Sequence, residues 1–189
     1  MAARVVVVRH GETEWSASLK HTSHTDVPLT EAGRRSAAAL AEALGGWSFS
    51  LVLTSPLRRA RETCELAGFS DLAAVDPDLR EWGYGDYEGL TTPEIRARQP
   101  DWSLWRDGCP GGESPAAVGQ RADRVLERVR ASHGDALLFA HGHILRVLSA
   151  RWLQMEVAAA ARFALAAGAF GILDYERETE VIWQWNLTS

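Results

Sequence analysis

Two short apolar runs, each followed by a histidine and a glycine, constrain the fold of this chain more than any other feature. Val5–Val8 precede Arg9–Gly11, and Ala136–Ala140 precede His141–His143. Runs of this length and composition are typical of strands buried on both faces of a parallel sheet. Ligands of open α/β sheets bind just beyond the carboxyl ends of such strands. We therefore expect both histidines at the same edge of one sheet.

The rest of the sequence alternates between helical and strand patterns. Helices are expected at Thr30–Leu44, Pro56–Ala67, near Pro93–Gln99, Ser114–Ala131 and about Gly142–Leu153. Further strands are expected at Leu51–Thr54, about Ala73–Asp76, and in a hairpin of Gly168–Tyr175 with Val181–Trp185. Thr30 and Ser55 are expected as helix N-caps, with Pro56 at the first helical position. The alternation predicts an α/β fold, a three-layer α/β/α sandwich around a mostly parallel central sheet with an antiparallel edge.

No repeat or flexible linker divides the chain, so residues 1–189 are predicted to form a single domain. One stretch, Arg80–Gly112, breaks the alternation and holds much of the tryptophan, proline and glycine. Long segments of this kind are uncommon in compact domains unless they serve a function. We expect this excursion, at about residues 80–112, to cover a substrate site as a wall or lid.

Charge and apolar patterning narrow the classes of partner. A net charge of -5 argues against nucleic acid and against anionic membrane surfaces. The longest apolar segment, Val157–Phe170, contains Arg162 and falls short of the roughly 20 residues that span a bilayer. The N-terminus lacks the pattern of a signal peptide. Cys64 and Cys109 form no CxxC pair, so a reducing cytoplasm is the expected location.

Two other segments add charged side chains to the predicted sheet edge. Arg58, Arg59 and Arg61 follow the second strand, and at least one of them is expected in the first turn of a helix. Both a guanidinium and the helix dipole favour phosphate at that position. Glu81 lies beside apolar residues and is predicted to be a partly buried acid with a raised pKa.

These residue types suit phosphoryl transfer without a metal ion or another cofactor. Neutral His10 would attack a phosphoryl group, while Arg9 and a second arginine neutralise its equatorial oxygens. Glu81 would protonate the leaving oxygen and then, as a carboxylate, activate water. His141 would donate to the phosphoryl oxygens. The sequence therefore predicts turnover through a phosphohistidine.

Five segments in a fixed order resemble the histidine phosphatase superfamily, in its phosphoglycerate mutase-like branch. They are Arg9–Trp15, Asp26–Gly33, Ser55–Ala60, Glu81–Gly89 and His141–Gly142. The resemblance implies that His10 is the phosphorylated nucleophile and Glu81 the proton donor. It also implies that Arg9, Arg59 and His141 complete the phosphate pocket. Ser16 stands where the family often has asparagine, and Thr22-Ser23 stands where Thr-Gly is common.

Finer similarity, in Tyr84–Thr92 and Trp105–Cys109, points to an acid phosphatase and sedoheptulose-1,7-bisphosphatase-like subgroup. That subgroup implies small sugar phosphates or bisphosphates as substrates. The expected substrate-binding residues are Gly11, Ser16, His21, Thr22, Ser23, Arg106, Gly142 and His143. For Arg106, Lys20, His21 and His24, exposed polar surface is an equally good interpretation.

Three rival functions stay open at this point. A phosphoglycerate mutase would share the phosphohistidine and differ in its lid. A metal-dependent hydrolase would use ligands from His10, His21, Asp26, His141 and His143, although Arg9 would repel the cation. A non-catalytic module would only bind a phosphorylated ligand. We favour a phosphatase of small phosphorylated metabolites, and the edge strand Val181–Trp185 leaves a homo-oligomer open.

Overall fold

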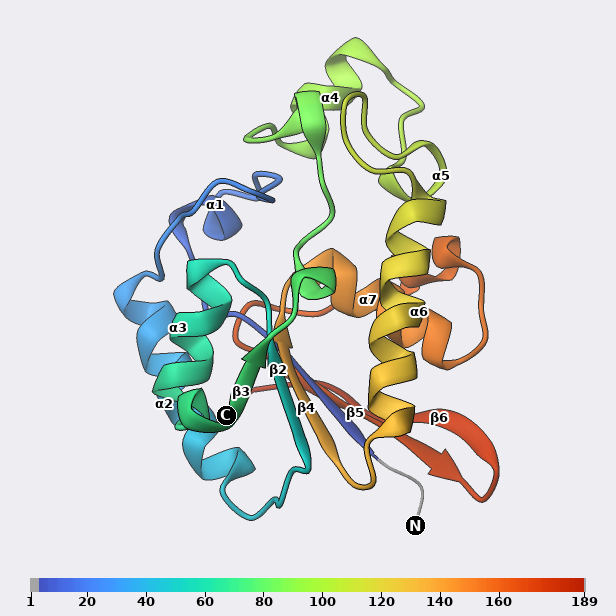
Figure 1. Cartoon of the computed structure of the whole chain (residues 1–189). Helices are drawn as coiled ribbons and strands as arrows, with labels where there is room; N and C mark the ends of the chain where they lie inside the picture. The colour runs from blue at the N-terminus through green and yellow to red at the C-terminus, as the bar shows by residue number, and fades with distance from the viewer. Residues whose placement is uncertain (1–3, 189) are drawn as a thin grey trace.

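The computed structural model describes residues 4–188, which form a three-layer arrangement around one six-stranded sheet (Figure 1). The strands are β1 Val5–Arg9, β2 Leu51–Thr54, β3 Ala73–Val75, β4 Ala136–Ala140, β5 Phe170–Glu176 and β6 Thr179–Leu187. Their order is β3-β2-β4-β1-β5-β6. The first four strands in this order pair in parallel, whereas β5 pairs antiparallel with β1 and β6 pairs antiparallel with β5. The predicted α/β class, with its mostly parallel sheet and antiparallel edge, is confirmed.

The two histidine-bearing strands are neighbours at the centre of the sheet. Val5 lies opposite Ala136, and the register continues to Arg9 opposite Ala140. Both strands therefore end level, and the His10 backbone N–H donates to the Ala140 carbonyl at 3.0 Å. Because parallel strands share one carboxyl edge, this register delivers the next residue of each strand to the same place.

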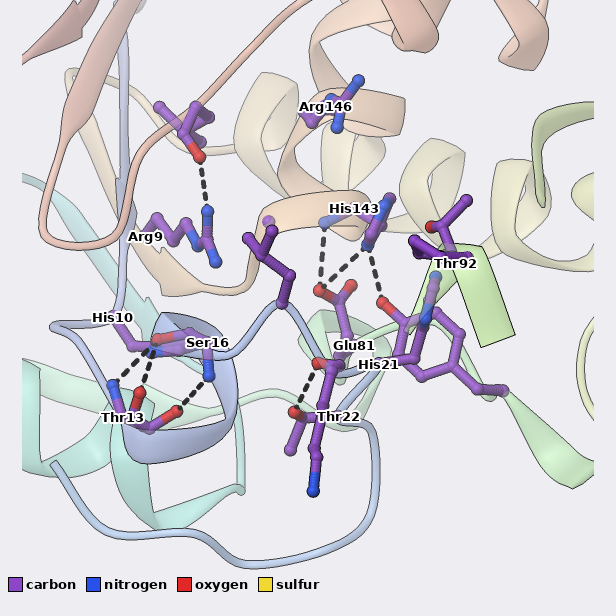
Figure 2. A pocket seen from close by; sticks show the side chains of 16 residues that line it. Arg9, His10, Thr13, Ser16, His21, Thr22, Glu81, Thr92, His143 and Arg146 are labelled. Atoms are coloured by element: carbon purple, nitrogen blue, oxygen red, sulfur yellow. Dashed lines mark hydrogen bonds and ion pairs between the residues drawn. The ribbon is translucent and has the colours of Figure 1, made fainter. Parts of the chain in front are cut away.

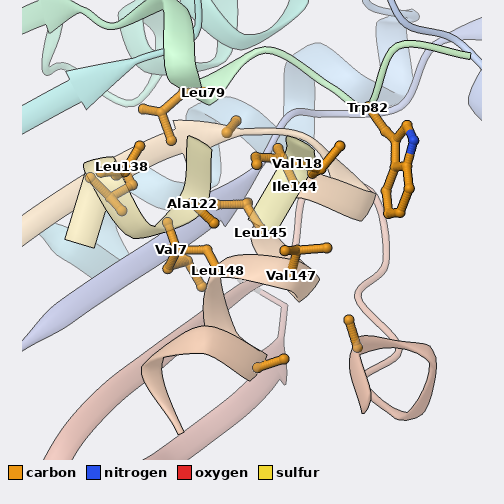
Figure 3. Packing of buried hydrophobic residues seen from close by; sticks show 14 of the residues in the cluster. Val7, Leu79, Trp82, Val118, Ala122, Leu138, Ile144, Leu145, Val147 and Leu148 are labelled. Atoms are coloured by element: carbon orange, nitrogen blue, oxygen red, sulfur yellow. The ribbon is translucent and has the colours of Figure 1, made fainter. Parts of the chain in front are cut away.

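Four longer helices cover the two faces of the sheet, two on each side (Figure 1). They are α2 Glu31–Leu44 and α3 Arg58–Leu66 on one face, and α6 Pro115–Ala131 and α7 Gly142–Trp152 on the other. On the second face, Val7 and Leu138 of the sheet pack with Ala122 of α6 and Leu148 of α7 (Figure 3). Successive side chains of β1 point to opposite faces of the sheet, and an apolar core covers each face. This explains why four consecutive residues of β1 are valines.

The excursion lies above the carboxyl ends of the parallel strands (Figure 1). It contains α4 Thr92–Arg98, α5 Leu104–Asp107 and the single-turn 3₁₀ helix η3 Gly85–Tyr87. Elsewhere the short elements are α1 Glu14–Ala17, η1 Ser70–Leu72, η2 Pro77–Leu79 and η4 Val157–Arg162. Trp82 and Trp102 are buried and belong to the same apolar core as one face of the sheet. The excursion is therefore packed onto the rest of the fold rather than an open loop.

One helix start differs from the prediction. The Thr30 hydroxyl accepts the Gly33 backbone N–H, which confirms the expected N-cap of α2. The predicted start of α3 at Pro56 is wrong, since the helix begins at Arg58 with Leu57 as N-cap. The Ser55 hydroxyl bonds to His141, at 2.7 Å between Oγ and Nε2, and it also accepts the Leu57 backbone N–H at 3.3 Å. The hydroxyl is thus shared between a distant strand end and the residue that caps α3.

Within residues 4–188, no helix combines the length and the apolar character needed to cross a membrane. Cys64 and Cys109 are buried free thiols. Burial raises the pKa of both to about 12, so neither is poised as a thiolate.

Candidate active site

His10, directly after β1, is buried at the floor of a pocket on the carboxyl edge. Its Nδ1 lies 2.7 Å from the Gly11 carbonyl oxygen. A carbonyl can only accept, so Nδ1 carries the proton and Nε2 keeps its lone pair. Burial, followed by the charges of Arg59 and Arg9, lowers the pKa of His10 to about 3. The imidazole is therefore neutral, with a fixed tautomer and a free lone pair on Nε2.

A glycine pair allows the His10 loop to lie against the start of α2. A Cβ on Gly11 would lie 2.3 Å from the Gly33 carbonyl oxygen, and one on Gly33 would lie 2.2 Å from that of Glu12. The Gly11 backbone N–H donates to the Thr63 hydroxyl at 3.0 Å. Gly11 thus acts through close backbone packing that holds His10 in place.

Two buried guanidinium groups lie close to His10. Arg9 donates through Nη1 to the Leu165 carbonyl at 2.6 Å, and Arg59 donates to the carbonyls of Thr22 and Ser23 at 3.0 Å. Burial lowers the pKa of each arginine from its usual value of 12.5. Within the described residues neither pairs with a carboxylate, and the Nε of each is buried without a partner. Both cations therefore keep donor capacity for an anion.

His141, directly after β4, is fully buried beside His10, with ring centroids 5.1 Å apart. Its Nε2 bonds to the Ser55 hydroxyl, whereas its Nδ1 is buried with no partner among the described residues. Burial and the charge of Arg59 lower its pKa well below 6.5. Arg9, Arg59 and His141 thus each leave one buried nitrogen unsatisfied. Such atoms are costly in a folded protein unless a ligand engages them.

Glu81 is buried and held as a carboxylate by the start of α7. It accepts backbone N–H groups from Trp82 at 2.9 Å, His143 at 3.0 Å and Ile144 at 2.9 Å. Burial by itself would raise the pKa of Glu81, but the His143 side chain, the His141 side chain and the His143 backbone bond outweigh it and lower the pKa well below 4.5. The predicted raised pKa of Glu81 is wrong, because these groups stabilise the charged form.

A cavity of about 320 Å³ is lined by Arg9, His10 and Glu81 (Figure 2). Its wall includes the predicted residues Arg9, His10, Ser16, His21, Thr22, Glu81, Gly142 and His143, together with Lys20. Arg59, His141, Gly11 and Ser23 lie outside this wall; Ser23 bonds to Glu88, at 2.5 Å between its Oγ and a carboxylate oxygen.

Two residues that were considered for substrate binding lie away from the cavity wall. Arg106 is an exposed residue of α5 that pairs with Asp107 at 2.7 Å. His24 is exposed, and its Nδ1 lies 3.8 Å from a Glu88 carboxylate oxygen. The structure therefore does not bring either side chain to His10.

Sequence reasoning missed Arg146 and gave Tyr84 no role, yet both line the cavity. Arg146 donates to the carbonyls of Ala160 and Ala161 at 3.0 Å. Its place four residues after Gly142 on a helix was an available signal, because such residues share a face. Burial raises the pKa of Tyr84 well above 10, so its neutral hydroxyl can donate to His143 Nδ1 at 2.6 Å.

The rival metal site lacks a suitable ligand cluster. Asp26 accepts the Arg58 backbone N–H at 3.0 Å and lines a different cavity with Arg34. In the part of the chain that the structure describes, no three His, Cys, Asp or Glu side chains are grouped to hold a metal ion.

The same chain matches known proteins along nearly its whole length. The model of the histidine phosphatase superfamily (branch 1) matches residues 5–188. An acid phosphatase of Mycobacterium tuberculosis is 43% identical over 177 residues, covering 92% of this chain and 87% of that protein. Sedoheptulose 1,7-bisphosphatase of Saccharomyces cerevisiae is 38% identical over 189 residues, covering 83% of this chain and 70% of that protein.

A solved structure of an open reading frame product from Mycobacterium tuberculosis superposes with a TM-score of 0.92. It is 40% identical, and the match covers 100% of this chain and 99% of that one. These findings confirm the resemblance that the motifs predicted, and they agree with the fold built from the strands and helices.

Proposed function

Because the chain belongs to the histidine phosphatase superfamily (branch 1), we propose that it is a metal-independent phosphatase of small phosphorylated metabolites, working through a phosphohistidine. The observation that carries the proposal is the set of buried, unsatisfied nitrogens on Arg9, Arg59 and His141 beside the free Nε2 of His10. Three donors around one nucleophile match the charged oxygens of a phosphoryl group.

The first step transfers the phosphoryl group to His10. Its Nε2 attacks phosphorus, an N–P bond forms, and the bond from phosphorus to the ester oxygen breaks. Arg9 and Arg59 neutralise the phosphoryl oxygens, and His141 donates through Nδ1. Glu81, a carboxylate at rest, takes up the proton of a phosphate monoanion and delivers it to the departing oxygen, so that an alcohol leaves rather than an alkoxide.

The second step hydrolyses the phosphohistidine. The Glu81 carboxylate takes a proton from a water molecule, whose oxygen attacks phosphorus as the N–P bond breaks. Neutral His10 is restored and inorganic phosphate is released. Because burial and two cations disfavour protonated His10 in the resting site, the imidazole returns ready for another attack.

Sugar phosphates and bisphosphates are the substrate class that we propose. The cavity of about 320 Å³ has room for a small ester, and Lys20 and Arg146 add cations to its wall. One relative named above is a sedoheptulose 1,7-bisphosphatase, which supports a sugar phosphate substrate. We also propose that the chain is one domain, and that its buried free thiols suit a reducing cytoplasm.

The decisive test is His10→Ala, assayed for phosphate release from a panel of sugar phosphates. We expect loss of turnover and of the acid-labile phosphoenzyme that the unchanged protein forms with substrate. The matched control is His24→Ala, since His24 is exposed and away from the cavity wall. Near-normal turnover in His10→Ala would refute the mechanism. Efficient interconversion of phosphoglycerates with little phosphate release would identify a mutase instead.

A further inference from the structure

The segment that carries Glu81 has no strand or α-helix of its own. It leaves β3 at Val75, makes the single turn η2 at Pro77–Leu79, and then runs irregularly through residues 80–84. Such a segment is fixed by the burial of Leu79, Trp82 and Tyr84 and by the bonds that other elements make to it. The position of the Glu81 carboxylate therefore depends on what holds this backbone.

Arg121, on α6, makes the most extensive contacts with that backbone. Its Nη1 donates to the carbonyls of Asp78 at 2.6 Å and Arg80 at 3.0 Å, and its Nη2 lies 3.4 Å from the carbonyl oxygen of Glu81. Arg121 is 8% exposed, so these bonds are shielded from water. One guanidinium thus spans the residues that lead into Glu81.

Glu113 completes the arrangement on the other side of Glu81. Its carboxylate accepts the Gly83 backbone N–H at 2.7 Å and binds Arg121 through both oxygens, at 2.7 and 2.8 Å. A Cβ on Gly83 would lie 3.3 Å from the Glu113 side chain, so the glycine allows this close packing. The paired side chains form hydrogen bonds with the backbone both before and after Glu81.

We propose that Arg121 and Glu113 are positioning residues that hold Glu81 where it can protonate the leaving group. The inference rests on the proposed phosphatase function. Neither side chain lines the cavity, so both act through Glu81 rather than on substrate. A misplacement of about 1 Å in a catalytic group can cost about a hundredfold in rate, which makes such support consequential.

The test compares two esters that differ in their need for a proton. p-Nitrophenyl phosphate has a leaving group that departs readily as an anion, whereas glycerol phosphate needs protonation. In Arg121→Met we expect kcat/KM, which reports phosphoryl transfer to His10, to fall about tenfold further for glycerol phosphate than for the aryl ester. The later hydrolysis of the phosphohistidine is common to both esters. Arg121→Lys, which keeps a cation and a donor, should restore part of the ratio.

Arg124→Met is the matched control on the same helix. Arg124 pairs with the Asp78 side chain at 2.6 Å and, within the described residues, donates to no backbone carbonyl of residues 78–83. The ratio of the rates on the two esters should therefore not change. If Arg121→Met does not fold, Glu113→Gln carries the same comparison, with circular dichroism and a thermal melt as the check of folding.

Equal losses of kcat/KM on both esters in a folded variant, or the same change of ratio in Arg124→Met, would overturn the inference. If the wild-type protein releases phosphate normally but its variants keep the wild-type ratio between the two esters, the inference is wrong and the proposed function stands. A wild-type protein that hydrolyses neither ester and forms no phosphoenzyme overturns the proposed function, and the inference with it.

Discussion

At the scale of single residues, two protonation states set the start of each turnover. His10 is neutral because burial and nearby cations disfavour a further charge, and Glu81 is ionised because the side chain and the backbone amide of His143 stabilise its carboxylate. The resting site therefore has its nucleophile ready but lacks the proton that the leaving group needs. That proton must arrive with the substrate, on a phosphate monoanion, and pass through Glu81.

This charge arrangement predicts faster hydrolysis in acid. A phosphate ester loses its second proton near pH 6, so the monoanion becomes scarce above that pH. We expect kcat/KM for an alkyl phosphate to fall by about tenfold per pH unit above pH 6. It should hold steady down to pH 5, since His10 gains a proton only at about 3. Rates measured from pH 5 to pH 8 check this.

Glu81→Gln provides the control for the pH profile. Glutamine keeps the shape of the side chain but cannot relay a proton, so hydrolysis of the alkyl ester should be slow at every pH. Hydrolysis of an aryl ester should suffer less. A rate that climbs from pH 5 to pH 7 in the unchanged protein would contradict the ionised resting state of Glu81.

At the scale of elements, the strand ends were predictable because their signals are local. Four consecutive valines specify a strand buried on both faces, and Thr30 lies where an N-cap is expected. The meeting of His10 and His141 follows once β1 and β4 pair in register. These features needed only short windows of sequence and the rule that parallel strands share a carboxyl edge.

Features that depend on distant partners were not predictable. The groups that lower the pKa of Glu81 include the side chain and the backbone amide of His143 at the start of α7, more than sixty residues further along the chain. The hydroxyl of Ser55 bonds to His141 as well as to the Leu57 backbone N–H at the start of α3. Arg121 looks like an ordinary helix residue until the packing of α6 is known. In each case tertiary contact decided the role.

The contact between the His10 loop and the first turn of α2 yields a second prediction. Gly33→Ala would place a methyl group 2.2 Å from the Glu12 carbonyl oxygen, so the loop or the helix must move. We expect a loss of about 1–3 kcal/mol in unfolding free energy and a lower kcat. Gly46→Ala, where the added carbon meets nothing within 4 Å, should leave kcat unchanged. Denaturant unfolding and steady-state assays measure both effects.

At the scale of the whole molecule, neutral histidines are built into the interior. His10, His21 and His141 are buried, and burial is the leading cause that lowers the pKa of each. In the unfolded chain such side chains titrate near pH 6.5. As the pH falls below that value, the unfolded state binds protons that the native state does not bind, so acid lowers the free energy of unfolding.

For His10 the size of this effect can be stated. Between pH 6.5 and pH 5 the unfolded form gains about 2 kcal/mol relative to the native form, because His10 in the native state titrates only at about 3. His10→Gln should therefore reduce the fall of unfolding free energy between pH 7 and pH 5 by about 2 kcal/mol. Urea unfolding of both proteins at pH 7 and pH 5 checks this, and parallel slopes would count against it.

The buried guanidinium groups of Arg9 and Arg59 link catalysis to folding. Within residues 4–188 neither has a carboxylate counterion, so an anion that engages them favours the native over the unfolded chain. Inorganic phosphate, the product, is such an anion. The more strongly it supports the fold, the more slowly it leaves. The same interactions therefore slow the release of phosphate and stabilise the folded chain. A substitution that speeds phosphate release must also reduce the stability that bound phosphate provides.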